Sequence, residues 1–376
     1  MLNPKINLVN LSRSEYKRYA RHLTLENIGV SGQKRIKEAK ILCVGAGGLA
    51  SSALIYLAAC GIGHICIIDN DIVDISNLQR QILYTKSDVG INKVSATRMR
   101  IKEVNPLCKL ETLAYRLTEN NAISIINRYD IVIDGSDNFE TRYIISKICF
   151  ELHKIHIYGA IQNFEGQVSV FNYKGGPNYY DLYPLSQAIK IQSCNIGVLG
   201  ILPGTIGMIQ ATEAIKIITG AGNILNGYLL IYDALNMSFK KIKLRSYTDP
   251  AKYNNINRYF IQTENLELER NKIDSYQLHE EMKKHHNETI VIDVRQISEF
   301  NLRHIDKALN IPIRLLKTEN QINNIKTNFH KKKIILYCSN DSRSLAASAI
   351  LSKNGIVHQR LKGGFTAWTK FMIQGV

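Results

Sequence analysis

Short apolar runs alternate along this chain with longer segments in which apolar residues recur every three or four positions. The clearest unit covers residues 41–69. Its pattern predicts a buried parallel strand over 41–44, a helix over 49–60 that stops at Gly61, and a second buried strand over 65–68. Strands joined by a helix in this way indicate an α/β fold with a parallel sheet.

A glycine-rich turn formed by Gly45, Gly47 and Gly48 joins the first strand to the helix. Glycines allow a backbone to approach a phosphate, and a helix N-terminus offers free N–H groups and partial positive charge. Asp69, at the end of the second strand, is placed to bond ribose hydroxyls. We therefore expect a nucleotide site. A turn of this kind also occurs without a ligand. Where it does bind a nucleotide, the protein is usually a dinucleotide-dependent oxidoreductase.

The residues after Asp69 argue against hydride transfer. Asn77, Arg80 and Gln81 follow in a polar stretch without a clear period, which we interpret as a loop, and Lys93 lies near the start of the next helix. An oxidoreductase has no need of an Arg and a Lys so soon after the ribose acid. An enzyme that handles a triphosphate does, because these cations neutralise charge that builds on the phosphates.

A second polar loop follows the apolar strand predicted over 130–134. Ligands bind at the carboxyl ends of strands in open α/β sheets. Asp137 in this loop is a candidate Mg²⁺ ligand, since Mg²⁺ prefers carboxylates together with substrate phosphate oxygens. Alternatively, Asp137 caps the helix predicted over 139–152, and the two roles are compatible.

An amphipathic helix is predicted over 11–21, with a capping box formed by Ser12 and Glu15. By its position alone, Arg21 is a solvated residue on the surface of this helix.

The other elements expected before residue 248 follow from the same periodicities. Residues 179–193 are irregular and read as a mobile crossover that ends at Cys194, and the apolar helix over 203–219 is expected to be buried against the sheet. The remaining predictions are a basic helix within 28–40, helices over 91–104 and 122–127, and strands over 110–115, 155–160, 166–172, 228–233 and 238–244.

A polar, Asn-rich and aperiodic stretch over 249–270 reads as a linker. A new pattern follows it, with helices over 275–284 and 344–353 and strands over 290–294, 333–338 and 357–361. We therefore expect a nucleotide-binding domain over 1–248, a linker over 249–271 and a small α/β domain over 272–376.

Cys338 stands where one of these strands ends, and a short loop leads from it to Arg343. Backbone N–H groups, a helix N-terminus and a nearby Arg all favour a thiolate. Phosphatases and sulfurtransferases use such a loop. Four residues separate Cys338 from Arg343, one fewer than in phosphatase loops sized for phosphate, which favours sulfur. The alternative is a buried, unreactive cysteine.

Composition excludes some classes. At 376 residues the chain has room for two or three domains, and 45% hydrophobic residues suffice for full-sized cores. No apolar run approaches the about 18 residues of a membrane span, so we expect a soluble protein without a membrane partner. The seven cysteines are scattered and include no C-x-x-C pair, which is typical of a reducing compartment.

The formal net charge of +16 has three interpretations. Nucleic-acid binding is one, but the basic residues are dispersed and no helix-turn-helix, zinc-finger or RNA-binding motif is present, so we expect no direct nucleic-acid partner. Steering of an acidic protein partner is the second. The third is an AT-rich genome, which encodes many Lys, Ile, Asn and Tyr residues.

Residues 272–376 resemble a rhodanese domain. The matching segments are Ile292-Asp293-Val294-Arg295, His304-Ile305 with Ala308-Leu309-Asn310-Ile311-Pro312, Cys338-Ser339-Asn340-Asp341-Ser342-Arg343, and Gly363-Gly364-Phe365 with Trp368. In that family the loop cysteine becomes a persulfide and passes on its outer sulfur. The resemblance gives this role to Cys338, with Arg343 holding the loop.

Residues 12–247 resemble the MoeB/ThiF adenylyltransferases, relatives of the ubiquitin-activating enzymes. The matching segments are Arg18-Tyr19-Ala20-Arg21, the GAGGLAS turn, Asp69-Asn70-Asp71, Ser76-Asn77-Leu78-Gln79-Arg80-Gln81, Gly90-Ile91-Asn92-Lys93 and Ser136-Asp137-Asn138. The resemblance implies a Rossmann-like ATP-binding domain with a mostly parallel sheet. It also implies adenylation of the C-terminal glycine of a ubiquitin-like sulfur-carrier protein.

The same resemblance assigns roles to single residues. Asp69 would bind the ribose, Asp137 would hold Mg²⁺, and the phosphates would be bound by Asn77, Arg80 and Lys93. Arg21 would reach into a neighbouring subunit's site, which implies a homodimer. Cys194 matches a cysteine of the family's crossover loop, with either a thioester or acyl-disulfide role or a packing role.

One departure from the family concerns zinc. The family usually carries two C-x-x-C pairs that bind structural zinc, but Asn178 and Asp181 stand at the first pair and no cysteine occurs near 249–253. Thiolate ligation is lost, so we expect no stoichiometric zinc.

Together the two resemblances predict an adenylyltransferase that is also a sulfurtransferase. The Cys338 persulfide, refilled by an upstream persulfide donor, would attack the activated carrier and give a thiocarboxylate. Molybdopterin synthesis is the preferred pathway for this thiocarboxylate, with thiamine synthesis and tRNA thiolation as alternatives. A tRNA-modifying dehydratase of the same superfamily would leave Cys338 unexplained. An inactive scaffold that binds a carrier is disfavoured by the intact Arg21, Arg80, Lys93 and Asp137.

The N-terminal residues 1–11 show neither a signal peptide nor a transit pattern. With the AT-rich composition, this favours a bacterial cytoplasm or the stroma of a plastid that encodes its own copy.

Overall fold

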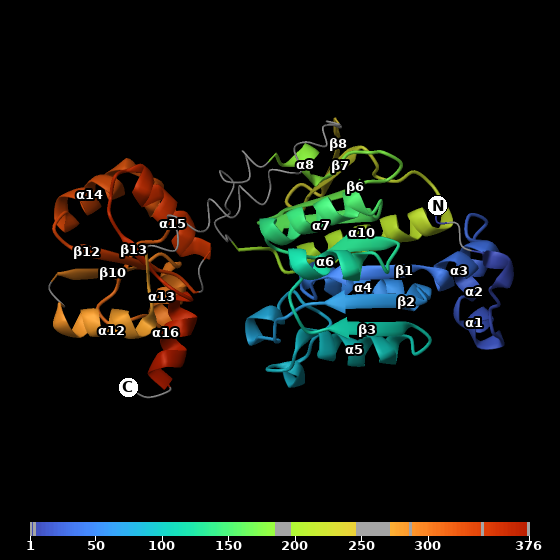
Figure 1. Cartoon of the computed structure of the whole chain (residues 1–376), viewed down its shortest axis with the longest axis horizontal. Helices are drawn as coiled ribbons and strands as arrows, with labels where there is room; N and C mark the ends of the chain where they lie inside the picture. The colour runs from blue at the N-terminus through green and yellow to red at the C-terminus, as the bar shows by residue number, and fades with distance from the viewer. Residues whose placement is uncertain are drawn as a thin grey trace. The chain divides into compact units, whose positions relative to one another are not determined.

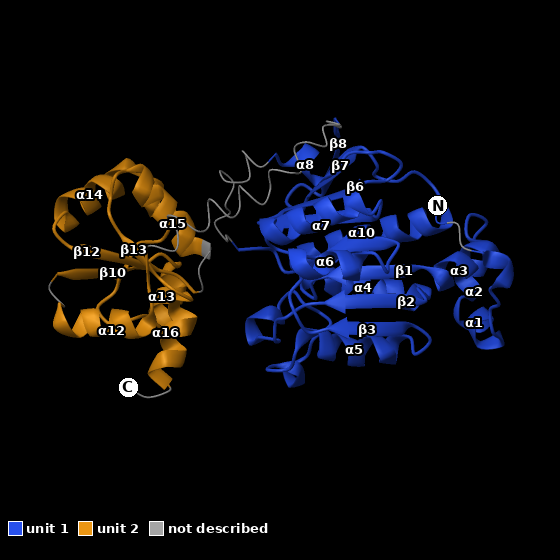
Figure 2. Cartoon of the chain, viewed as in Figure 1, with its two compact units in different colours: residues 1–188, 197–249 blue, residues 189–196, 250–376 orange. Residues whose placement is uncertain are grey.

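The computed structural model describes residues 2, 5–184, 197–245, 271–285, 288–339 and 342–373 (Figure 1). The chain divides into two compact units, which Figure 2 colours separately. Unit 1 comprises residues 1–188 and 197–249, and unit 2 comprises residues 189–196 and 250–376. Residues 246–270 lie outside the described ranges, so the linker over 249–271 and the domain limits beside it stay predictions.

Unit 1 is built on a sheet of eight strands in the order β3-β2-β1-β4-β5-β6-β7-β8. The first five strands in this order pair in parallel, and β6, β7 and β8 continue the sheet antiparallel. The expected Rossmann-like fold with a mostly parallel sheet is confirmed. The strands are β1 (Lys40–Val44), β2 (His64–Ile68), β3 (Lys109–Leu113), β4 (Ile131–Asp134), β5 (Ile155–Gln162), β6 (Glu165–Phe171), β7 (Tyr228–Asp233) and β8 (Ser238–Lys243).

Helices cover both faces of this sheet, and β1 shows why its central strands are largely apolar. Ile41 and Cys43 belong to the core formed with α3, α4, α5 and α10, whereas Leu42 and Val44 belong to the core formed with α6 and α7. A strand buried on both faces has no polar positions. These helices are α3 (Gly29–Glu38), α4 (Gly48–Cys60), α5 (Lys93–Val104), α6 (Glu119–Ile126), α7 (Phe139–Glu151) and α10 (Leu202–Thr219).

The strand order reverses between β1 and β4, because the chain first builds outward from β1 through β2 and β3 and then returns to the other side of β1. Open α/β sheets bind ligands at such a switch point. Within the described ranges, no helix has both the length and the apolar character needed to cross a bilayer.

The helix predicted over 11–21 is interrupted at Tyr19. Helix α1 (Arg13–Arg18) begins with the expected capping box of Ser12 and Glu15, and α2 (Ala20–Leu23) follows. Tyr19 is buried, and its hydroxyl accepts a hydrogen bond from Asn105 Nδ2 at 2.9 Å. This long-range anchor ends the first helix, and local periodicity does not reveal it.

Two further predictions are corrected. Helix α7 is capped by Asn138, whose Oδ1 accepts a hydrogen bond from Thr141 N at 2.9 Å, and not by Asp137. The crossover expected to be irregular over 179–193 begins with a short helix, α8 (Tyr179–Leu182), because Tyr179 is buried among aromatic rings. Cys194 and the rest of residues 185–196 lie outside the described residues.

Unit 2 has a sheet of five parallel strands in the order β11-β10-β12-β13-β9. The strands are β9 (Lys272–Ile273), β10 (Thr289–Asp293), β11 (Leu309–Asn310), β12 (Lys333–Tyr337) and β13 (Gln359–Leu361). The helices are α12 (Ser275–Lys284), α13 (Ile297–Leu302), α14 (Glu319–Phe329), α15 (Ser342–Lys353) and α16 (Gly364–Ile373). The sequence analysis missed β9, β11, α13, α14 and α16, in part because two-residue strands and a six-residue helix are too short to show a period.

Two glycines of α10 differ in how closely they approach α4. A Cβ at Gly207 would lie 2.0 Å from the Leu49 carbonyl oxygen, whereas a Cβ at Gly204 would meet nothing within 4 Å. Gly207 therefore sets the distance between the two helices, and Gly204 does not.

We expect Gly207→Ala to lower the free energy of unfolding of unit 1 by about 1–3 kcal/mol, because the added methyl forces α10 away from α4. Gly204→Ala, in the same helix, should be neutral or stabilising by up to about 1 kcal/mol. Urea unfolding followed by circular dichroism measures both variants. Equal unfolding midpoints would contradict the role given to Gly207.

Candidate functional site

The turns that follow β1 and β4 pack backbone against backbone at the switch point. Gly45 has a φ of +92°, and a Cβ there would lie 2.8 Å from the Gly135 carbonyl oxygen. A Cβ at Gly48 would likewise lie 2.9 Å from the Pro203 side chain, so this position has no room for a side chain either. Gly47 is open, since the nearest atom to a Cβ there would be Gln81 Nε2 at 3.9 Å. Packing thus requires two of the three glycines, and Gly47 offers the space for a phosphate.

Asp69 shapes the same turn through its carboxylate. Its Oδ2 accepts a hydrogen bond from Ala46 N, and its Oδ1 accepts one from Asp71 N, both at 2.7 Å. These bonds hold the end of β2 against the glycine turn. Each oxygen keeps a further lone pair, so the expected ribose contact is compatible with them.

Lys93, the first residue of α5, is paired with a residue to which the sequence analysis gave no role. Its Nζ lies 2.7 Å from Asp71 Oδ2, and 8% of the Lys93 side chain is exposed against 61% for Asp71. A nearly buried ammonium requires a negative partner. The two residues are 22 positions apart, so no local pattern reveals the pair.

The segment from Asp71 to Gln81 is a loop, as predicted, with one turn of 3₁₀ helix, η2 (Ile75–Asn77). Asn77 Oδ1 accepts a hydrogen bond from Asp74 N at 3.1 Å, and Arg80 Nη1 donates one to the Ser76 carbonyl at 3.0 Å. Both polar side chains are thus held by the loop's own backbone.

Gln81 ties this loop to the glycine turn. Its side chain is buried, and its Oε1 has no hydrogen-bond partner among the described residues. The preceding carbonyl oxygen, that of Arg80, lies 3.4 Å from the place of a Gly48 Cβ, so the loop runs beside the N-terminus of α4.

Asp137 is exposed in the turn after β4, and a buried network fixes that turn. Asp134 Oδ1 accepts hydrogen bonds from Ser136 N and Oγ at 3.0 and 2.6 Å, and its Oδ2 lies 3.1 Å from His156 Nε2. Arg142 donates to the Ser136 carbonyl at 2.9 Å. Burial tends to raise the pKa of Asp134, but the His156 contact outweighs it, so that pKa lies below its ordinary value.

Arg21 lies at the other end of the sheet from the glycine turn. It is exposed in α2, close to Tyr19, and a Cβ at Gly61 would lie 2.5 Å from the Tyr19 ring. Gly61 ends α4, whose first residue is Gly48, and thirteen helical residues span about 20 Å. Figure 1 shows α1 and α2 together at this end of unit 1. Arg21 therefore does not join the candidate site of its own chain.

In unit 2, Cys338 follows β12 directly and is buried, with its Sγ 3.7 Å from Ser344 Oγ. Arg343, at the far end of the loop, forms a two-pronged ion pair with Glu299 of α13, at 2.5 and 2.8 Å. Its Nη2 also donates to Ser339 Oγ at 2.7 Å. Arg343 thus contacts both Glu299 and Ser339, the residue after Cys338, and Glu299 is a partner that the sequence analysis missed.

The Glu299 contact influences the charge of both groups. Its hydrogen bonds raise the pKa of Arg343 above the ordinary value. Burial tends to raise the pKa of the Glu299 carboxyl, but the hydrogen bond and charge of Arg343 outweigh it and lower that pKa. Both side chains are therefore charged at neutral pH.

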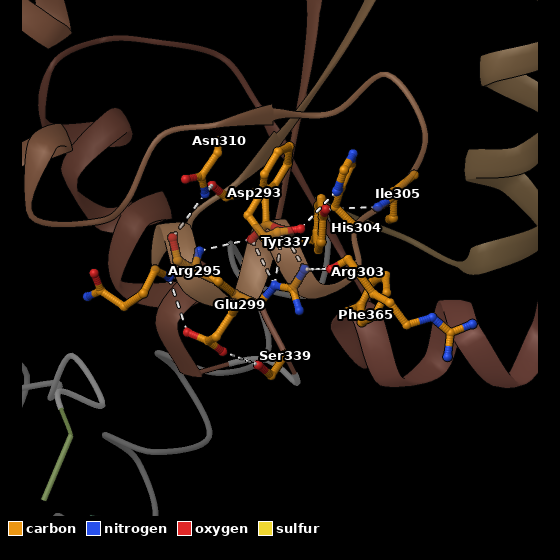
Figure 3. A network of polar contacts seen from close by, with 12 residues as sticks. Asp293, Arg295, Glu299, Arg303, His304, Ile305, Asn310, Tyr337, Ser339 and Phe365 are labelled. Carbon is orange, nitrogen blue, oxygen red and sulfur yellow. Dashed lines mark hydrogen bonds and ion pairs between the residues drawn. The ribbon is translucent and has the colours of Figure 1, made fainter.

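A second ion pair supports α13 and the strands beneath it (Figure 3). Arg295 Nη2 lies 2.7 Å from Asp293 Oδ2 and also donates to the Arg303 carbonyl at 2.7 Å. The guanidinium lies over the Phe365 ring, 4.4 Å from its centre. Asn310 Nδ2 donates to the carbonyls of Asp293 and Arg295. Three of the four quoted rhodanese-like segments therefore meet in one network around the buried Arg295.

The residues at the first zinc-pair position bond each other's backbone. Asn178 Oδ1 accepts hydrogen bonds from Tyr180 N and Asp181 N, and Asp181 Oδ2 accepts one from Asn178 N at 2.9 Å. Together they form a capping box at the start of α8. Side-chain oxygens used in this way are not a thiolate zinc site.

Comparison with known proteins identifies both units. The ThiF family model matches residues 19–254, and the rhodanese-like domain model matches residues 275–371. A probable molybdopterin-synthase adenylyltransferase of Porphyra purpurea is 46% identical over 99% of this chain and 97% of its own. The probable adenylyltransferase/sulfurtransferase MoeZ of Mycobacterium tuberculosis is 38% identical over 96% of this chain and 95% of its own.

A solved structure supports the fold. The crystal structure of SeMet PaaA has a TM-score of 0.55 at 22% identity, and the match covers 65% of this chain and 77% of that one. The two family matches and the full-length relatives confirm the resemblances seen in the sequence. The chain therefore belongs to the ThiF family, carries a C-terminal rhodanese-like domain, and is an adenylyltransferase and sulfurtransferase.

Proposed function

We propose that this enzyme uses ATP to adenylate the C-terminal glycine of a ubiquitin-like sulfur-carrier protein and then transfers sulfur to it from a persulfide on Cys338. The supporting observation is the convergence of the glycine turn, Lys93 and the Asp137 loop at one edge of the sheet. The same chain carries Cys338 in a loop that Arg343 holds.

In the adenylation step, Gly47 and the N-terminus of α4 face the phosphates, and Asp69 binds the ribose. Lys93 exchanges Asp71 for a phosphate, so one ion pair replaces another. Charge on the departing pyrophosphate is stabilised further by the side chains of Asn77, Arg80 and Gln81.

Asp137, with Asn138 beside it, is the proposed Mg²⁺ ligand. Among the residues that the structure describes, no three His, Cys, Asp or Glu side chains group as a metal site. Substrate phosphate oxygens and water would therefore complete the coordination shell, as Mg²⁺ prefers. Bound there, the ion would offset phosphate charge. Asp134 and Arg142 keep the turn in place through Ser136.

The chemical steps balance as follows. The carrier carboxylate attacks the α-phosphorus and pyrophosphate leaves. The Cys338 persulfide attacks the acyl carbon, and AMP leaves with the electron pair of the broken C–O bond, giving an acyl disulfide. A thiolate then attacks the Cys338 sulfur and releases the carrier thiocarboxylate. The alternatives for Cys194 are a thioester or acyl disulfide with the carrier, or a packing role. An external thiol reduces the resulting disulfide, and an upstream persulfide donor refills Cys338.

The small subunit of molybdopterin synthase is the proposed carrier, because a relative named as a probable molybdopterin-synthase adenylyltransferase aligns over nearly the whole chain. Carriers of thiamine synthesis or tRNA thiolation are the alternatives. If the chain were a tRNA-modifying dehydratase, the Cys338 loop would have no role in its reaction.

A homodimer is part of the proposal, since Arg21 lies near the end of α4 that is opposite the glycine turn, and α4 spans about 20 Å. Arg21 would then serve the site of a second copy. The proposed location is the plastid stroma or a bacterial cytoplasm. The red-algal origin of the Porphyra purpurea relative favours the plastid.

Cys338→Ala should keep carrier-dependent ATP–pyrophosphate exchange within about twofold of wild type and abolish thiocarboxylate formation, because the adenylate forms in unit 1. Lys93→Ala should lower exchange by at least about 100-fold, because the phosphates lose a buried cation. Labelled pyrophosphate and mass spectrometry of the carrier report the two steps. Sulfur transfer by Cys338→Ala would exclude Cys338 as donor, and no exchange with any carrier would favour a scaffold.

Mixing Arg21→Ala and Lys93→Ala chains tests the shared site. Each homodimer should be inactive, whereas a mixed dimer holds one complete site, so a statistical mixture should recover about one quarter of wild-type exchange. Differently tagged chains purified together supply the mixed dimer. Absence of recovery in that dimer would place Arg21 outside the partner's site.

A further inference from the structure

The ends of the Cys338 loop meet at a single carboxylate, that of Glu299. Its Oε1 accepts hydrogen bonds from Arg343 Nη2 at 2.8 Å and from Ser339 Oγ at 3.2 Å, and its Oε2 accepts one from Arg343 Nη1 at 2.5 Å. Ser339 directly follows Cys338, and Arg343 is the second residue of α15, the helix after the loop. Glu299 therefore joins the two ends of the segment that carries the reactive sulfur, and Figure 3 shows its contact with Ser339.

Glu299 is itself fixed on the side away from the loop. Its Oε2 accepts a hydrogen bond from Gln296 N at 3.1 Å, which is the capping box of α13. Helix α13 in turn follows the buried Asp293–Arg295 pair. The carboxylate is thus held on a supported element and not on a free side chain.

The pairing also sets the charge that an incoming sulfur compound meets. Arg343 is 15% exposed in its side chain and directs both terminal nitrogens at Glu299 or Ser339. A guanidinium binds a dianion best when its two-pronged edge is free. A dianionic donor must therefore compete with Glu299 for Arg343, whereas a persulfide needs only access to its outer sulfur.

We propose that Glu299 is a positioning residue for the loading of Cys338, and that by occupying Arg343 it favours persulfide donors over dianionic donors such as thiosulfate. This rests on the proposed role of Cys338 as the sulfur acceptor. In the loading step, the Cys338 thiolate attacks the outer sulfur of the donor. One S–S bond forms and one breaks, and the leaving group departs with the electron pair, as a thiolate from a persulfide or as sulfite from thiosulfate, so no oxidant is required.

The test uses the full chain and two donors, glutathione persulfide and thiosulfate, with cyanide as the final sulfur acceptor. Glu299→Gln removes the charge but keeps the shape. We expect kcat with the persulfide to fall about tenfold, because the loop loses its ionic anchor, and KM for thiosulfate to fall, because Arg343 is freed. The thiosulfate-to-persulfide ratio of kcat/KM should rise at least about tenfold.

Two further variants separate charge from folding. Glu319→Gln makes the same charge change at an exposed position of unit 2 and should leave the donor ratio at the wild-type value. Glu299→Asp keeps the charge with a shorter reach, so it should retain the wild-type ratio with a lower kcat. If Glu299→Gln fails to fold, a raised ratio in Glu299→Asp still overturns the proposal.

An unchanged donor ratio in folded Glu299→Gln would also overturn the proposal. The proposed function fails differently. If wild-type enzyme forms no persulfide on Cys338 with either donor, as judged by mass spectrometry, then Cys338 is not the acceptor. ATP–pyrophosphate exchange, which takes place in unit 1, should be the same in all these variants.

Discussion

The contact between the turns after β1 and β4 is the constraint on which unit 1 depends. Gly45 and Gly135 approach so closely that a single added carbon on Gly45 would collide with backbone. That approach is possible only because β1 and β4 are hydrogen-bonded neighbours at the point where the strand order reverses. The two loops therefore lie side by side at one edge of the sheet, with the open Gly47 on one and Asp137 on the other.

Two carboxylates then hold these loops in place. The Asp69 carboxylate binds two backbone N–H groups, and Asp134 binds a backbone N–H and a hydroxyl of the next turn. The buried Asp134 carboxylate would cost several kcal/mol without such partners, so its turn is tied to this geometry. Lys93 differs, since its partner Asp71 is largely exposed, so this ion pair can be broken at small desolvation cost.

In unit 2 a carboxylate likewise holds a loop in place, here the loop that carries the Cys338 sulfur. A parallel strand ends at Cys338, and a carboxylate from another element, Glu299, holds the loop through Arg343 and Ser339. In each unit the reactive edge follows parallel strands, and acidic side chains order the turns. The chemistry differs because one edge presents N–H groups and a lysine, and the other presents a thiol.

The sequence by itself determined the element types in unit 1, the α/β class, the family of each unit and the residues to examine, because apolar runs, glycine turns and local motifs are properties of neighbouring residues. It misplaced the cap of α7 by one residue and did not foresee the break at Tyr19. Only the tertiary structure decided which side chains pair. Lys93 with Asp71 and Arg343 with Glu299 are separated by 22 and 44 positions. It also decided that Arg21 lies far from the glycine turn of its own chain. Such pairs depend on which loops the strand order brings together, and no periodicity along the chain encodes that order.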